Sequence, residues 1–237
     1  MLKKLLFGLA VGTVALVAVS YNKQKKSAIL TDAKKFKADY ESINDLKREK
    51  DGKIIRHISI PEENPMIYSN CEEIVSKIDA KDSFAVYFGF NECPWCRSCV
   101  ETMIATAKEL NLEKIYYVDV KEVRDILALN SNNELIIQKN GGSGYAELLS
   151  KLDSVLADYT LKDAEGNEVS TNEKRIYAPN VVIVKDGEPL IMIEGTSKLQ
   201  KDANEELSVE MINDMKEIFT AAFGLLNNKE SCGVRGC

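Results

Sequence analysis

Histidine and tryptophan are nearly absent from this sequence, which contains one of each alongside six cysteines. A zinc site built on a Cys-x-x-Cys pair normally takes a second pair or histidines as its remaining ligands. The single histidine, His57, falls in a predicted strand, and we assign it a structural role. We therefore expect neither a metal ion nor another cofactor.

The cysteines also lack the even spacing of a small disulfide-stabilised domain. Three lie within seven residues, two lie near the C-terminus and one stands alone: Cys93, Cys96, Cys99, Cys232, Cys237 and Cys71. With 237 residues, of which 45% are apolar, the chain can fold around an ordinary hydrophobic core without such bridges. The close group of three therefore indicates chemistry rather than cross-linking.

Positive charge is scarce beyond the first 26 residues. The whole chain carries a formal net charge of −6, and residues 1–26 contain five lysines and no acidic residue. Removing those five positive charges leaves the rest of the chain at −11. An acidic body of this kind repels nucleic acids and anionic lipid, so nucleic-acid binding is excluded.

A long apolar run occurs at residues 5–19, after the basic pair Lys3 and Lys4. Such a run spans about 23 Å as a helix, short of a hydrocarbon core of about 30 Å, but flanking lysines make a thin span feasible. We expect residues 1–26 to form an uncleaved membrane anchor; the alternatives are a secretory signal cleaved near Ser20 and a buried helix. The first two readings place the rest of the chain outside the cytoplasm, where disulfides persist.

Residues 27–52 form an amphipathic segment with a predicted helix at 31–50, because apolar residues recur at spacings of three and four. This helix is either a stalk or an element packed on the following domain, and we favour packing. Periodicity and turn residues predict these further elements, in chain order: a strand at 53–60, a helix opened by a capping box at Ser69 and Glu72, a central strand at 84–90 buried on both faces, a helix at 94–110, a strand at 114–120, a short helix at 123–129, a helix ending near 157, a hairpin at 159–176, a hairpin at 180–194, and a closing helix at 209–226.

Two thiols stand one helical turn apart where the apolar strand at 84–90 gives way to a helix: Cys93 and Cys96, with Pro94 and Trp95 between them. The first turn of a helix presents unpaired N–H groups and the positive end of its dipole, and both favour a thiolate. Cys93 is thus the predicted accessible nucleophile, and Cys96 the thiol that resolves a mixed disulfide. Pro94 suits a first turn because the N–H that it lacks would be unpaired there. Trp95 either offers an apolar face to the substrate or simply packs.

This strand–Cys-x-x-Cys–helix arrangement, with Ala178-Pro179 before a later apolar strand, resembles the thioredoxin superfamily over residues 54–226. The resemblance implies a thioredoxin-like α/β fold, with a central mixed sheet flanked by helices, in a domain at 53–226. It also implies a cis bond before Pro179, opposite the thiols, and an Ala178 backbone that binds an extended substrate chain. The sequence is similar to membrane-anchored thioredoxin-like proteins of Gram-positive bacteria, including bacteriocin transport accessory proteins. An insertion at about 130–176 precedes the cis-proline strand and serves either as a lid or partner surface or as decoration.

Two features depart from that family, and the C-terminal tail adds two further cysteines. Thioredoxin carries a buried aspartate six residues before its first cysteine, and that position here is Tyr87, so the carboxylate that assists the resolving thiol is missing. Cys99 adds a third thiol one turn later; we expect a small buried residue, with an auxiliary redox role or an iron–sulfur or zinc site as alternatives. The tail at 227–237 contains Cys232 and Cys237, which either exchange a disulfide with the site, bond to each other or remain unpaired.

These features together predict an extracytoplasmic thiol–disulfide oxidoreductase that acts on exported proteins, in a direction that the sequence leaves open. The alternative is a non-catalytic thioredoxin-like accessory or chaperone module for the export of peptides such as bacteriocins. The expected partners are protein or peptide thiols and disulfides, a membrane redox partner, and the cytoplasmic membrane through the N-terminus.

Overall fold

The computed structural model describes residues 31–49 and 51–227, and every helix and strand below belongs to one compact unit that begins at Asp32. The predicted anchor at residues 1–26 and the tail cysteines, Cys232 and Cys237, lie outside the described residues. Within the described ranges, no helix has both the length and the apolar character needed to cross a membrane.

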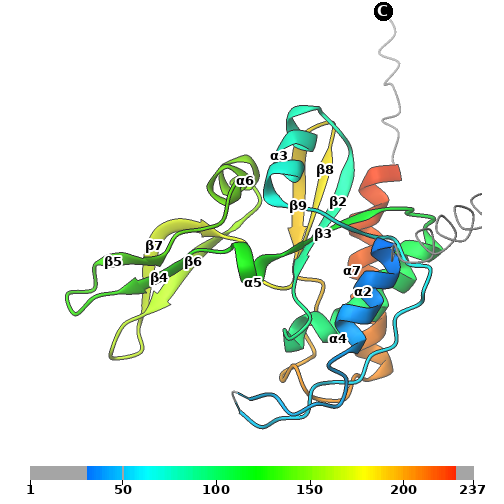
Figure 1. The fold of residues 1–237 in the computed structure, drawn as a ribbon, viewed down its shortest axis with the longest axis horizontal. Coiled ribbons are helices and arrows are strands. Elements are labelled where there is room, and N and C mark those ends of the chain that lie inside the picture. Colours follow the sequence, from blue (N-terminus) through cyan, green and yellow to red (C-terminus); the bar gives the residue numbers. More distant parts are fainter. Residues whose placement is uncertain (1–30, 50, 228–237) are drawn as a thin grey trace, which may run out of the picture. The chain divides into compact units, whose positions relative to one another are not determined.

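A five-stranded mixed sheet forms the centre of the unit, in the order β1-β3-β2-β8-β9 (Figure 1). The strands β1 (Met66–Tyr68), β3 (Ile115–Asp119) and β2 (Phe84–Gly89) are parallel, whereas β8 (Asn180–Lys185) runs antiparallel to β2 and to β9 (Glu188–Ile193). All six residues of β2 are buried, so the predicted central strand is confirmed. The expected α/β fold with a mixed sheet flanked by helices is confirmed as well.

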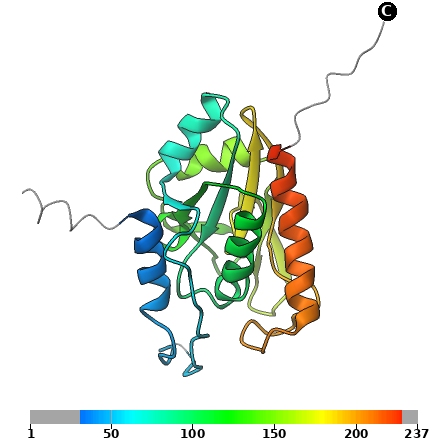
Figure 2. The ribbon, with the colours of Figure 1, turned by 90° about the vertical axis from the view of Figure 1, so that its right-hand side faces the viewer.

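Three helices cover one face of the sheet: α2 (Asp32–Glu41), α4 (Pro94–Glu109) and α7 (Val209–Asn227), as Figure 2 shows. Their apolar side chains pack over Ala85 and Tyr87 of β2 in one continuous core. The predictions for α4, β3, the β8–β9 hairpin and α7 are confirmed to within about two residues at each end. This face contains the cysteines of α4.

The opposite face of the sheet carries a second core beneath α3 (Cys71–Asp79) and α6 (Tyr145–Leu152). Phe84, Val86 and Phe88 of β2 point into it, alternating with the residues of the first face. Both faces of β2 are therefore buried from solvent, which explains why every residue of the strand is apolar or aromatic or is glycine.

The N-terminal helix packs on the domain, as the favoured interpretation expects. Phe36 and Tyr40 of α2 are completely buried in the first core. The helix ends at Glu41, however, well before the predicted end. The reason is a tertiary contact: the Asn44 side chain accepts the N–H of Ile58 at 3.2 Å and donates to its carbonyl at 2.8 Å, which holds the chain in a turn.

The strand predicted at 53–60 is wrong. The segment makes one isolated bridge, between Lys47 and Ile54. Further on, the N–H of Ile60 bonds at 2.7 Å to the Glu41 carboxylate rather than to a neighbouring strand. Side chains satisfy the N–H groups of residues 58–60, whereas residues 53–55 bond to the backbone of the turn before them, so the apolar residues reach the core without joining the sheet.

The helix α3 is capped by a different residue than the sequence predicts. Asn70, not Ser69, is the N-cap, and its side chain accepts the N–H of Glu73 at 2.8 Å. The Ser69 hydroxyl bonds instead to the Glu73 carboxylate at 2.9 Å. Asparagine and serine are similarly good caps, so local preference alone does not choose between neighbours.

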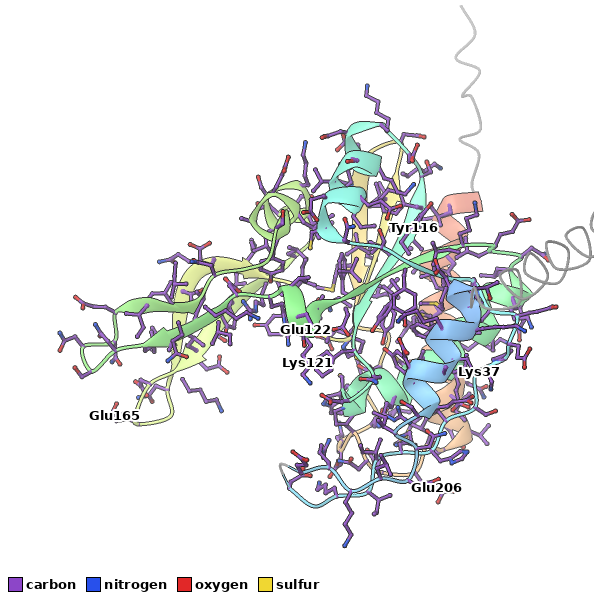
Figure 3. The ribbon with its side chains drawn as sticks, in the orientation of Figure 1. Lys37, Tyr116, Lys121, Glu122, Glu165 and Glu206 are labelled. Carbon is purple, nitrogen blue, oxygen red and sulfur yellow. The ribbon has the colours of Figure 1, made fainter. Side chains whose placement is uncertain are left out.

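The insertion, together with the strand just before it, forms two antiparallel hairpins and α6. The predicted helix at 123–129 is wrong, because the helical turn α5 (Val120–Val123) ends earlier and a strand follows. The four hairpin strands β4, β5, β6 and β7 are Ile126–Leu129, Leu135–Lys139, Ala157–Lys162 and Glu168–Arg175. The second hairpin was predicted, and Glu165 lies at its tip (Figure 3).

Candidate active site

The end of β2 and the start of α4 hold Cys93 in place. After Gly89 the chain turns, with the Cys93 N–H bonded to the Phe90 carbonyl at 3.2 Å. Cys93 then acts as the N-cap of α4, and its sulfur accepts the N–H of Cys96 at 3.2 Å. Pro94 occupies the first turn, as predicted. The sulfur therefore lies at the end of the helix where N–H groups are unpaired.

The surroundings of Cys93 favour its thiolate. Hydrogen bonding from the Cys96 thiol lowers the pKa of Cys93, and the N–H groups of Cys96 and Trp95 and the charge of Arg124 act in the same direction against the opposing effect of burial. The first turn of α4 has no acidic residue. The neighbouring Glu92 is paired with Lys121 of α5 (labelled in Figure 3), which offsets its charge.

The other two thiols of α4 are held neutral. Burial raises the pKa of Cys96 and of Cys99, and hydrogen bonding to Cys93 adds to the rise at Cys96. The Cys99 sulfur donates to the Cys96 carbonyl at 3.5 Å and is 1% exposed, as expected of a small buried residue. The four cysteines in the described ranges are all free thiols. Those ranges contain no group of three or more histidine, cysteine or carboxylate side chains arranged to hold a metal ion.

The fold brings Ala178-Pro179 to the thiols from far along the chain. The peptide bond between them is cis, as predicted. The Cys93 sulfur lies 3.4 Å from the Ala178 carbonyl oxygen, to which its thiol donates. The predicted residues Cys93, Cys96 and Ala178 thus meet at one place.

Cys93 is less accessible than the sequence analysis expects. Only 4% of the residue is exposed, because Trp95 and Ala178 pack around the core to which it belongs. Ala178, Pro179 and Trp95 line a groove of about 760 Å³ that runs along β9 and the residues after it. Cys93 does not itself line this groove, which reaches its neighbours Trp95 and Ala178.

Trp95 also lines a second hollow, of about 1030 Å³. Its other walls come from the loop after α2, residues 43–55, and from Phe90, Glu92 and Lys121. Trp95 thus contributes an apolar surface to two hollows, and its role towards a substrate stays a prediction.

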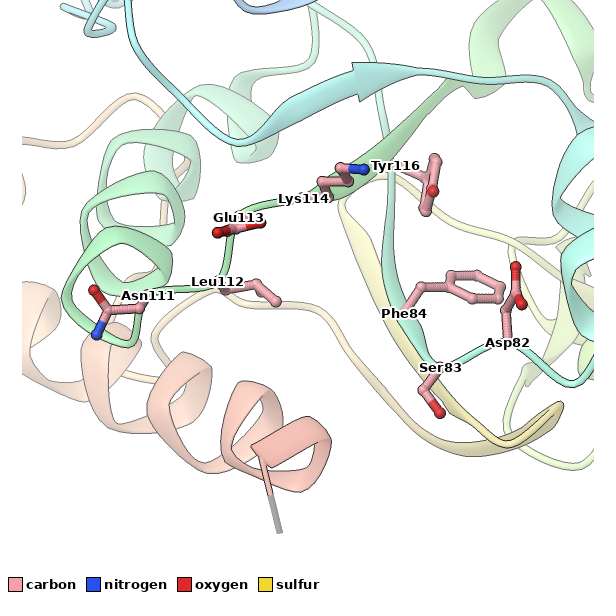
Figure 4. Close-up of a pocket in the computed structure, with 8 residues that line it drawn as sticks. All are labelled: Asp82, Ser83, Phe84, Asn111, Leu112, Glu113, Lys114 and Tyr116. Atoms are coloured by element: carbon pink, nitrogen blue, oxygen red, sulfur yellow. The ribbon is translucent and has the colours of Figure 1, made fainter. Parts of the chain in front are cut away.

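A third cavity lies away from the thiols, at the other end of β2. It measures about 470 Å³ and is lined by Asp82, Phe84, Lys114 and Tyr116, among others (Figure 4). Phe84 begins β2, whereas Cys93 follows the end of that strand. Because the cavity lies at the opposite end of β2 from Cys93, we do not connect it with the thiol chemistry.

Sequence reasoning missed two buried residues that lie next to the site. Arg97 is 1% exposed, and its guanidinium donates to backbone carbonyls of the segment that precedes the sheet, including Tyr40 at 2.7 Å and Arg56 at 2.9 Å. Tyr40 itself lies beside Tyr87, with 3.1 Å between their hydroxyl oxygens. The amphipathic pattern identifies Tyr40 as a core residue, but nothing local connects it with Cys96.

Neither protein-family models nor curated proteins supply a relative for this chain. The interpretation of the site therefore depends on its geometry and on the chemistry of its side chains.

Proposed function

We propose that this protein is a thiol–disulfide oxidoreductase with a thioredoxin-like fold, and that Cys93 and Cys96 are its redox pair. The observation that carries the proposal is the position of the Cys93 sulfur, which accepts the Cys96 N–H at the start of α4 and lies 3.4 Å from the Ala178 carbonyl oxygen. The mixed sheet, the helices on both of its faces and the cis Ala178-Pro179 bond support the thioredoxin-like assignment.

The chemistry follows from the different pKa shifts of the two thiols. The Cys93 thiolate attacks one sulfur of a substrate disulfide, forms a mixed disulfide and releases the other sulfur as a thiolate. Cys96 then loses its proton and attacks the Cys93 sulfur, which releases the second substrate sulfur. The pair becomes oxidised as the substrate gains two electrons. The reverse sequence oxidises a substrate dithiol.

The lowered pKa of Cys93 supports the oxidising direction. Stabilising the Cys93 thiolate favours the reduced pair, and a pair that favours reduction transfers its disulfide readily to other thiols. Apolar residues 5–19 support a membrane anchor that holds the domain outside the cytoplasm. The proposed substrates are then exported proteins, and a membrane protein would restore the oxidised pair.

A Cys96→Ser variant tests the proposal, because it leaves the nucleophile in place and removes the thiol that releases the partner. We expect it to accumulate mixed disulfides with exported proteins, visible on non-reducing gels. Cys93→Ser is the matched control and should trap none. Equilibration with glutathione would give the reduction potential and thus the direction. If Cys93 titrates as an ordinary thiol and the pair exchanges with neither disulfides nor dithiols, the proposal fails.

The groove of about 760 Å³ beside Trp95 favours a second candidate function, a module that binds peptides during export without redox chemistry. Both functions would use the same groove. A double variant, Cys93→Ala with Cys96→Ala, separates them: a binding module keeps its effect on peptide export, whereas an oxidoreductase loses its effect on substrate disulfides.

A further inference from the structure

Tyr87 replaces the carboxylate expected beneath the resolving thiol, and its hydroxyl contacts that thiol. Tyr87 is completely buried, and its hydroxyl is a hydrogen-bond partner of Cys96. A second hydroxyl lies behind it, since the Tyr40 and Tyr87 oxygens are 3.1 Å apart. The two phenols thus form a buried line of hydroxyl groups that leads from α2 to the sulfur of Cys96.

Gly89 makes room for this arrangement. A Cβ atom at position 89 would lie 2.3 Å from the Tyr87 hydroxyl oxygen and 2.4 Å from the ring carbon that carries it. Both residues belong to β2 and point to the same face of the sheet, two positions apart. The Tyr87 ring therefore lies across Gly89, and any other residue at that position would displace the hydroxyl.

Aromatic packing fixes both phenols. The Tyr40 ring stacks on Phe36 with centroids 4.4 Å apart, and the Tyr87 ring stacks on Tyr117 at 5.7 Å. Rings held in this way have few alternative positions, so their hydroxyl groups are fixed before any reaction occurs.

Side chains from several of the elements packed around it act on the Cys96 sulfur. The titratable groups that do are two thiols and three phenols: Cys93 and Cys99 of α4, Tyr87 of β2, Tyr40 of α2 and Tyr117 of β3. Burial raises the pKa of Tyr87 and of Tyr40, so both remain protonated at neutral pH and can only donate to a thiolate. Deprotonation of Cys96 is therefore unfavourable, because burial raises its pKa, and a hydrogen-bond donor to the thiolate would favour this step.

We propose that Tyr87 is a catalytic residue that donates a hydrogen bond to the Cys96 sulfur as its thiolate forms, and that Tyr40 is the positioning residue that orients the Tyr87 hydroxyl. This inference rests on the proposed function and assigns the role of the missing carboxylate to a pair of neutral hydroxyls. Either hydroxyl can be the donor at 3.1 Å, but while Tyr87 donates to the Cys96 sulfur, the hydrogen bond between the phenols requires Tyr40 to donate to the Tyr87 oxygen, which strengthens Tyr87 as a donor. The helix α2, N-terminal to the sheet, thereby becomes part of the redox centre.

The step balances without any further reactant. In the mixed disulfide between Cys93 and a substrate, Cys96 gives up its proton, and its sulfur attacks the Cys93 sulfur. A bond forms between Cys93 and Cys96, the bond to the substrate breaks, and the departing substrate thiolate takes up a proton. Neither tyrosine changes its protonation state. Tyr87 stabilises the negative charge on Cys96 only while that charge exists, which is the condition for accelerating the step.

The two steps separate when the reduced protein reacts with 5,5′-dithiobis(2-nitrobenzoate). Attack by Cys93 releases one coloured thiolate, and resolution by Cys96 releases the second. The full chain is used in detergent, with serine at positions 232 and 237 so that the tail thiols do not react. We expect Tyr87→Phe to leave the first phase within about twofold and to slow the second about tenfold or more at pH 7, because a hydrogen bond to a charged group is lost.

The pH profile separates a chemical role from a structural one. Tyr87→Phe should move the midpoint of the second phase to higher pH, and Tyr40→Phe should move it in the same direction by less. Tyr145→Phe is the matched control, since it removes another buried phenol hydroxyl, in the second core, and should leave both phases unchanged. Thermal unfolding of each variant verifies that the fold is retained.

Gly89→Ala provides an independent test, because it keeps both hydroxyls and displaces one of them. The second phase should slow, whereas Gly224→Ala, where an added Cβ meets no atom within 4 Å, should change nothing. A Tyr87→Phe variant with the parental rate and midpoint in the second phase overturns the inference. A first phase no faster than that of an ordinary free thiol overturns the proposed function instead.

Discussion

Cys93 and Cys96 are the same residue type on neighbouring turns of one chain segment, yet their surroundings move the two pKa values in opposite directions. Cys93 is at the open end of the helix, where N–H groups point at its sulfur. Cys96 lies one turn further in and is fully buried, and burial is the main cause of its raised pKa. The proposed roles of Cys93 as nucleophile and Cys96 as resolving thiol therefore rest on a difference of a single helical turn.

The largest contribution to the lowered pKa of Cys93 is its hydrogen bond with the Cys96 thiol, so Cys96→Ala is expected to raise that pKa. Part of the lowering should remain, because the N–H groups of Trp95 and residue 96 are unchanged. Alkylation by iodoacetamide across a pH series measures the midpoint. Cys99→Ala is the control. It removes a thiol that bonds to the Cys96 carbonyl and not to Cys93, so the alkylation midpoint of Cys93 should stay unchanged. Equal midpoints in both variants would contradict this account.

Arg97 stabilises the fold beside the site rather than the chemistry. Its buried guanidinium donates to the carbonyls of Tyr40, Asn91 and Arg56 and to the side chain of Asn44. Arg97→Met leaves these acceptors unsatisfied, and we expect the free energy of unfolding to fall by about 3 kcal/mol in urea titrations. Arg48→Met removes a surface ion pair with Asp51 and should stay close to the parent. Similar losses in both variants would show that Arg97 has no special role.

At the scale of elements, two hairpin turns offer a matched comparison. Gly187 between β8 and β9 has φ +82°, and a Cβ there would lie 2.6 Å from the Ile78 carbonyl oxygen. Gly166 between β6 and β7 has φ +87° and no atom within 4 Å of such a Cβ. We expect Gly166→Ala to cost about 1 kcal/mol for the backbone conformation alone, and Gly187→Ala about 3 kcal/mol because the clash adds to it. Urea unfolding measures both, and equal losses would refute the clash.

The elements that the sequence predicts well are those whose signal is local. β2 is apolar on both faces, Pro94 begins α4, and Asp186-Gly187 forms the turn of the β8–β9 hairpin. Residues next to each boundary therefore predict where the element begins or ends. The end of α2 cannot be predicted from neighbouring residues, because Asn44 bonds to Ile58 only after the chain has folded back. The spacing of apolar residues along the chain does not predict long-range contacts of this kind.

The same distinction holds for the site. The thiol spacing predicts Cys93 and Cys96, and the X-Pro pair predicts the bond that faces them. The contact between Tyr40 and Tyr87 joins residues that are 47 positions apart and belong to different elements. Tyr87 alone was recognisable, as a departure from an expected carboxylate, and its partner became visible only in three dimensions.

For the whole molecule, the thiol surroundings link redox state to stability. Cys93 has a lower pKa in the folded reduced protein than in the unfolded chain. Its contribution to stability is therefore fully present above the unfolded pKa of about 8.5 and is lost as the pH falls through the folded value. The raised pKa of Cys96 acts in the opposite sense and reduces stability only at pH values above that of an ordinary thiol. The disulfide form has neither thiol and shows neither effect.

We therefore expect the stability of the reduced form relative to the oxidised form to decrease as the pH is lowered from 8 towards 4. The disulfide also restricts the unfolded chain, but that contribution is independent of pH, so the slope isolates the Cys93 thiolate. Urea unfolding of both redox forms across this range measures the difference, and each unit of pKa shift corresponds to about 1.4 kcal/mol. The reduced Cys93→Ser chain should lack the slope, since it has no thiol at that position. A difference that stays constant with pH would mean that Cys93 gains no thiolate stabilisation on folding, and the oxidising direction would lose its support.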